Sequence, residues 1–177
     1  MLQALKLAAV GVVTLLCLST TVLAEFVPNP DFTQGDAEKG KRVYQRVGNC
    51  ASCHGWAADG GAGRNPMEHA QGANLRETQL DEQGLFDTIR CGRPGTKMPY
   101  HDSVSYKDGR CNGLLMKDFT PDQAPTSGKT FSENQLIDLI AYLEKYVVGK
   151  GKATYEECRL YYDTNPDKSC AYFKDGN

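Results

Sequence analysis

The sequence lacks several patterns that would assign it to large classes of proteins. It has no long basic run and a formal net charge of -2, so nucleic acid is not an expected partner. No segment alternates apolar and polar residues as half-buried strands do, so we predict an all-α fold. No general acid–base pair or nucleophilic triad is evident, and we expect a protein that is not an enzyme.

The composition is otherwise that of an ordinary globular domain. The 177 residues are 40% hydrophobic and 24% charged, and this length suits a single domain. Seven cysteines are the exception. A cytosolic protein of this size seldom has so many unless they bind metal or carry out redox chemistry.

The first 24 residues have the pattern of a cleaved secretory signal. An uncharged apolar run from Leu7 to Ala24 follows Lys6, and small or short residues precede the expected cleavage after Ala24. An uncleaved membrane anchor is the alternative, because 18 such residues nearly span a bilayer. Cys17 follows two leucines, which argues against a lipid anchor there. We therefore expect a periplasmic mature chain, residues 25–177, with six cysteines.

Cys50, Cys53 and His54 lie in the string C-A-S-C-H, the most specific signal in the chain. On one turn of helix, cysteines three residues apart share a face, where both sulfurs can bond to the vinyl groups of one haem. The adjacent histidine can then bind the haem iron from one side. A thioredoxin-type motif would need a preceding strand, and a zinc site would need a second ligand pair. The string therefore predicts one covalent haem c, with His54 as an iron ligand.

The opposite side of the iron is either open or closed by a second side chain. The candidates are Met67, Met98, Met116, His69 and His101. Met98 lies 44 residues after His54, between Cys91 and Pro99, where two glycines and two prolines favour a rigid loop. The two candidates nearest to His54 have only a short path around the porphyrin, and Met116 follows two leucines as a core residue would. We predict Met98 as the second ligand, with His101 as an alternative.

The segment Asp36–Tyr44, followed by C-A-S-C-H-G, resembles the opening of a class I mono-haem cytochrome c. The resemblance extends to about Tyr146, and the loop around Met98 is similar to the axial-methionine loop of that family. It implies helices packed around one haem. In this family a proline carbonyl orients the iron-bound histidine, and the resemblance gives this role to Pro66, with a plain turn residue as the alternative.

Three further residues are candidates for contacts with the haem. Trp56 is expected either to pack on the haem or its propionates or to be an ordinary core residue. Arg93 and Lys97 flank the loop of Met98, and we expect them either to pair with the propionates or to be solvated cations.

Three segments have the periodicity of amphipathic helices. The first covers residues 37–47, where Gly40 is expected to permit the close approach of another helix. The second covers about residues 81–90. The third starts at a Ser132–Gln135 capping box and ends near Val148. The family resemblance implies that the first and third cross near the haem edge.

Four cysteines remain, and their proximity in sequence favours the pairs Cys91–Cys111 and Cys158–Cys170 among three possible arrangements. The first pair would close a loop around Met98, and the second would staple the C-terminal extension. A redox-active thiol pair is the alternative, but the sequence has no basic cluster that would lower a thiol pKa.

Two segments depart from a minimal cytochrome with a core of about residues 36–148. Asp102 to Thr130 is a long polar insertion, expected either to dock a redox partner or to cover the haem face. Residues 149–177 form an extension in which Thr154 begins a short capped helix and Asn165-Pro166 makes a turn.

Together these patterns predict a periplasmic carrier of single electrons with one haem ligated by His54 and Met98. Its expected partners are redox proteins, a periplasmic dehydrogenase and/or a membrane oxidase, and no lipid anchor is expected. His/Met ligation favours a high reduction potential compared with two histidines. A fixed electron-accepting subunit of a dehydrogenase complex is the alternative, and a five-coordinate haem sensor or peroxidase is a third reading.

Overall fold

The computed structural model describes residues 30–60, 72–162 and 164–174. Helices and turns make up this part of the chain, which has two isolated β-bridges and no strand, in agreement with the predicted all-α class. Within the same ranges, no helix is both long and apolar enough to cross a bilayer. The predicted signal peptide, residues 1–24, lies outside the described residues.

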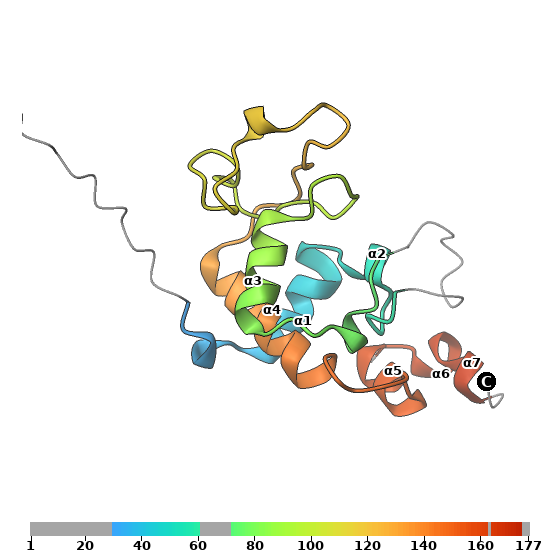
Figure 1. The fold of residues 1–177 in the computed structure, drawn as a ribbon. Coiled ribbons are helices and arrows are strands. Elements are labelled where there is room, and N and C mark those ends of the chain that lie inside the picture. The colour runs from blue at the N-terminus through green and yellow to red at the C-terminus, as the bar shows by residue number, and fades with distance from the viewer. Residues whose placement is uncertain (1–29, 61–71, 163, 175–177) are drawn as a thin grey trace, which may run out of the picture.

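Figure 1 shows how the helices are arranged. The α-helices are α1 (Ala37–Arg42), α2 (Ala51–His54), α3 (Glu82–Cys91), α4 (Glu133–Tyr146), α5 (Tyr155–Tyr161), α6 (Pro166–Ser169) and α7 (Ala171–Lys174). A π-helical turn, η2 (Val43–Val47), continues α1, and three 3₁₀ turns are η1 (Phe32–Gln34), η3 (Leu75–Glu77) and η4 (Met116–Asp118). All three helices expected in the core are therefore present, although the first changes to π geometry at Val43.

The centre of the fold is the crossing of α1 and α4, the first and third predicted helices (Figure 1). A Cβ atom at Gly40 would overlap the backbone carbonyl of Asp138 and come within 2.7 Å of the Cβ atom of Tyr142. Only glycine permits this approach, as the sequence predicts. The carboxylate of Asp138 also accepts a hydrogen bond of 2.8 Å from the backbone N–H of Asp36, the residue that caps α1.

The hydrophobic core lies between α1–η2, α3 and α4. Its largest members are Val43, Tyr44, Leu85, Phe86, Ile89, Phe131, Leu136, Leu139, Ile140, Tyr142 and Leu143. Asp81 caps α3, and the predicted capping box of Ser132 and Gln135 begins α4. Both boundaries follow from side chains that accept hydrogen bonds from otherwise unpaired N–H groups of the first turn.

The insertion folds as a small lobe beyond the end of α3, above the core in Figure 1. Its own apolar cluster consists of Cys91, Tyr106 and Cys111, with Tyr100 and Phe119 packed against them. The sulfur atoms of Cys91 and Cys111 are 2.02 Å apart, which is a disulfide distance.

The C-terminal extension packs on the side of the core that carries α2 (Figure 1). As predicted, Thr154 caps α5, and the sulfurs of Cys158 and Cys170 lie at a disulfide distance of 2.02 Å. The chain bends at Asn165, and Pro166 is the first residue of α6, where its missing N–H costs nothing.

Arg76 joins the extension to the core and was not found from the sequence. Its side chain is 4% exposed, and its guanidinium donates to Glu157 Oε1 at 2.8 Å and to the carbonyl of Ala57 at 3.2 Å. It also bonds to the carbonyl of Gly151. A charged group buried this deeply is stable only when its donors are paired, so Arg76 fixes where the extension begins.

Candidate functional site

The C-A-S-C-H string forms α2 and the residue that precedes it. The N–H of Cys50 donates to the carbonyl of Tyr44 at 2.8 Å, and the N–H of His54 donates to the carbonyl of Cys50 at 2.9 Å. The hydroxyl of Tyr44, buried beneath α2, donates to the carbonyl of Gly55 at 2.7 Å. A four-residue helix is not stable by itself, so the two bonds made by Tyr44 of η2 hold α2 in place.

Cys50 and Cys53 are the unpaired cysteines of the described chain. Burial raises the pKa of the Cys50 thiol to about 12, which is opposite to the shift that a thioredoxin-type nucleophile needs. The thioredoxin-type interpretation of the string is therefore disfavoured. Among the described residues, no three His, Cys, Asp or Glu side chains gather as a metal site would require.

The imidazole of His54 is oriented by a backbone carbonyl. Its Nδ1 lies 2.9 Å from the carbonyl oxygen of Ala73, and since a carbonyl can only accept, Nδ1 carries the proton. Burial, the larger influence, lowers the pKa of His54, and the bond to Ala73 opposes this effect. The neutral ring therefore keeps Nε2 available as a metal ligand.

The carbonyl that orients His54 in the described chain is that of Ala73, 19 residues after His54. Pro66, for which we predicted this role, lies outside the described residues. The sequence analysis did not name Ala73. A local signal was present: Asn74 caps η3, and Leu75 packs against the core, which fixes the segment that carries the Ala73 carbonyl.

The segment from Gly72 to Leu75 is held tightly against α2. The N–H of Gly72 donates to the carbonyl of Cys53 at 2.8 Å, and the N–H of Leu75 donates to Ala58 at 2.8 Å. A Cβ atom at Gly72 would lie 2.7 Å from both Cys53 O and His54 Nδ1. Glycine is therefore required for the contact that orients His54.

We expect Gly72→Ala to displace this segment and weaken the bond between His54 and Ala73. Overpacking of this kind lowers the free energy of unfolding by about 1–3 kcal/mol, which thermal unfolding of the holo-protein would measure. The reduction potential should change as well, because that bond sets the basicity of the imidazole. Gly84→Ala in α3, whose backbone is ordinary helix, is the control. Equal stability and potential in the two variants would contradict this role.

Met98 lies in the rigid loop that the sequence predicts. Gly92 and Gly95 have φ angles of +65° and +73°, and the N–H of Arg93 donates to the carbonyl of Met98 at 3.1 Å. The N–H of Met98 donates to the hydroxyl of Thr96 at 3.1 Å. The half-buried Met98 side chain packs against the same apolar cluster that Cys50 contacts.

The insertion supports this loop from its outer side. The N–H of Gly95 donates to the carbonyl of Gln123 at 3.0 Å, and the N–H of Tyr100 donates to Thr126 at 2.9 Å. The hydroxyl of Tyr106 donates to the carbonyl of Cys91 at 2.6 Å, at the start of the loop. We call residues 102–130, together with the Cys91–Cys111 pair, the methionine brace.

The other candidates for the second ligand are placed differently. His101 is buried, stacks on Phe131 at 4.2 Å between ring centroids, and donates from Nδ1 to the carbonyl of Lys129 at 2.7 Å. Met116 was expected in the core, and that prediction is wrong, because its side chain is 40% exposed in η4. Met67 and His69 lie outside the described residues.

The half-buried Trp56 packs against the C-terminal extension, and its contact with the haem stays a prediction. Its ring lies 5.6 Å from Tyr161, 6.0 Å from Tyr162 and 5.8 Å from Phe173, so it contacts α5 and α7. Arg93 and Lys97 are exposed, and in the described part of the chain their side chains have no ion-pair or hydrogen-bond partner. Their pairing with propionates remains a prediction.

Residues 35–111 match a family described as cytochrome c oxidase, cbb3-type, subunit III. This segment is a class I c-type cytochrome domain. The match contains the whole C-A-S-C-H string, Ala73 and Met98, so the resemblance seen in the sequence is confirmed over these residues. No curated protein matches the chain.

A cytochrome domain of this class implies a covalently bound haem c, and the residues here fit that group. Two unpaired thiols lie on a helix that ends in His54, whose Nδ1 is fixed by a carbonyl. Cys50 and Met98, 48 positions apart in sequence, reach one apolar cluster. Cytochrome domains of this class transfer electrons by means of their haem.

Proposed function

We propose that this protein carries single electrons between redox proteins through one haem c. Cys50 and Cys53 would bind the haem covalently, and His54 and Met98 would be the two iron ligands. The observation that carries the proposal is that the fold positions both of these side chains. His54 is oriented by Ala73, and the loop of Met98 is supported by the methionine brace. When bound, the haem supplies an iron that changes oxidation state by one electron.

The residues around the haem suit electron transfer better than catalysis. A methionine held by a rigid loop keeps the iron closed to small molecules, and a fixed histidine limits the movement that accompanies a change of charge. The apolar cluster against which Met98 packs excludes water, which raises the reduction potential. We infer that the protein is not an enzyme.

The location that we propose is the periplasm. Two cysteine pairs lie at disulfide distance, and disulfides persist in oxidising compartments outside the cytoplasm. The predicted signal sequence at residues 1–24 supports the same location.

A fixed subunit of a redox complex is the second candidate, and the family match favours it. The matching family is named for a subunit of a cytochrome oxidase, and the match ends at Cys111, inside the methionine brace. The rest of the brace and the C-terminal extension would then form a permanent interface with a membrane oxidase or a periplasmic dehydrogenase.

Purification from the native host separates these two candidates. A free carrier should run as a small monomer that takes up one electron per chain in a reductive titration. A subunit would instead elute with a catalytic chain after mild extraction. Uptake of two or more electrons per chain would contradict the single haem in either case.

Loss of the Cys91–Cys111 pair should weaken the brace. For a closed loop of 20 residues, the double variant Cys91→Ser, Cys111→Ser should lose about 3 kcal/mol, or roughly 6–12 °C in Tm. On heating, its methionine-to-iron charge-transfer band should disappear before the protein unfolds. Cys158→Ser with Cys170→Ser, which removes the pair in the extension, should keep that band until unfolding. Identical behaviour of the band in both double variants would rule out a brace.

A further inference from the structure

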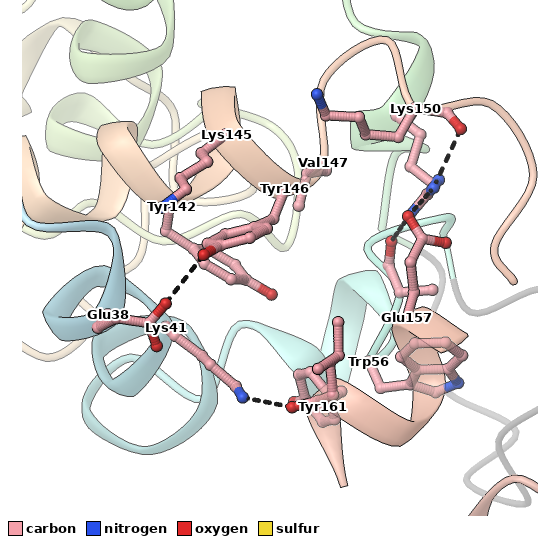
Figure 2. A pocket seen from close by; sticks show the side chains of 13 residues that line it. Glu38, Lys41, Trp56, Tyr142, Lys145, Tyr146, Val147, Lys150, Glu157 and Tyr161 are labelled. Carbon is pink, nitrogen blue, oxygen red and sulfur yellow. Dashed lines mark hydrogen bonds and ion pairs between the residues drawn. The ribbon is translucent and has the colours of Figure 1, made fainter. Parts of the chain in front are cut away.

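A cavity of about 370 Å³ lies between α1, α4 and α5 (Figure 2). The two haem-binding cysteines and the two proposed iron ligands are not among its lining residues. Trp56, Tyr146 and Tyr161 are among its walls. Its volume lies at the lower end of the range for small-molecule sites, about 300–1,000 Å³. The cavity is therefore large enough for a small ring compound.

The hydroxyl of Tyr142 points into this cavity (Figure 2). The Tyr142 residue is only 5% exposed, and its hydroxyl has no hydrogen-bond partner within the described ranges. The hydroxyl oxygen is not among the fully buried polar atoms that lack a partner, so it is accessible from the cavity. Burial raises its pKa, so the hydroxyl keeps its proton and can donate. An acceptor bound in the cavity could therefore take the hydrogen bond of this hydroxyl in place of water.

The charges on the cavity wall favour an anion as that acceptor. The ionisable lining residues, apart from tyrosines, are the cations Lys41, Arg76, Lys145 and Lys150 and the carboxylates Glu38 and Glu157. The wall thus has an excess of positive charge, although the whole chain has a net charge of -2. The carboxylate of Glu157 forms an ion pair with Arg76. The carboxylate of Glu38 accepts a hydrogen bond of 2.9 Å from the hydroxyl of Tyr146.

We propose that this cavity binds a small aromatic carboxylate. The ring would pack against Trp56 and Tyr161, whose own rings lie 5.6 Å apart, and the carboxylate would accept the hydrogen bond of Tyr142. Lys41 and Lys145 supply attraction for the charge. None of these residues is a proposed ligand of the haem iron.

Isothermal titration of the haem-loaded protein with benzoate tests the site. Benzyl alcohol, which lacks the charge, and cyclohexanecarboxylate, which lacks the aromatic ring, are the matched compounds. We expect benzoate to bind with a Kd of about 1 mM or tighter, and at least tenfold more tightly than either of them. Tyr142→Phe should weaken benzoate binding by about tenfold, because it removes one hydrogen bond to a charged group.

Two further variants keep the test decisive if Tyr142→Phe does not fold. Lys145→Gln, at an exposed position, should also weaken benzoate binding, whereas Tyr155→Phe, in α5 but outside the cavity, should leave it unchanged. The proposal is overturned if benzoate binds more weakly than about 10 mM. It is overturned equally if the neutral alcohol binds as well as benzoate, or if Lys145→Gln binds like the unaltered protein.

Discussion

Exchange of both Cys50 and Cys53 for serine should abolish covalent attachment of haem. The two thioethers have no other source in the described chain, because the remaining four cysteines there are paired. Mass spectrometry of the denatured, exported protein should give the bare polypeptide for the variant. The unaltered protein should carry the added mass of one haem. The effect should be complete loss rather than a partial one.

Ser52→Ala is the matched control, because Ser52 lies between the two cysteines on the same helix. Its hydroxyl donates to the carbonyl of Asn49 at 2.7 Å, so the substitution disturbs α2 slightly without removing a thiol. This control should retain the haem mass. A double-serine variant that still carries haem after denaturation would disprove the assignment of the thioether bonds.

Replacing Met98 by alanine should open one side of the iron. The ferric protein should change from low spin to high spin and lose its methionine-to-iron charge-transfer band, and the reduced protein should bind carbon monoxide. We expect the reduction potential to fall by about 0.1–0.3 V, part of the roughly 0.8 V range that axial ligands cover. Absorption spectroscopy and a potentiometric titration measure these changes.

Met116→Ala is the control for this experiment, since Met116 is exposed in η4 of the insertion. It should leave the spectrum and the potential unaltered. If Met98→Ala instead keeps a low-spin iron with a methionine band, another methionine is the ligand. If it has no effect because the iron was already open, the five-coordinate alternative is correct.

The sequence predicted best where one local pattern determines the structure. The capping box of Ser132 and Gln135 begins α4 as expected, and Gly40 marks the helix crossing because no side chain fits beside Asp138. The two cysteine pairs also agree with the pairing chosen from proximity in sequence. In each case the deciding interaction involves neighbours in sequence or a single steric requirement.

Predictions that relied on distant contacts were less successful. The carbonyl that reaches His54 comes from Ala73, 19 residues along the chain, and the sequence analysis did not name it. No pattern in the sequence singled out Arg76, because the partners of its guanidinium are Glu157 and backbone carbonyls that are distant in sequence. The packing of Trp56 likewise depends on Tyr161 and the rest of the extension, whose position no local pattern in the sequence gives.

The sequence also left the role of the insertion open. From its length and polarity, residues 102–130 were expected either to dock a partner or to cover the haem face. The carbonyls of Gln123 and Thr126 accept hydrogen bonds from the loop of Met98, and Tyr106 donates one to its start, so the segment supports this loop. A brace and a docking surface can coexist, but only the brace follows from observed contacts.

The ferric absorption spectrum of the protein, exported with intact haem-attachment machinery, tests the central claim most directly. An iron held between His54 and Met98 should be low spin, with the weak methionine-to-iron band at the red end of the spectrum. A colourless product, a high-spin spectrum or a low-spin spectrum without that band would contradict the account.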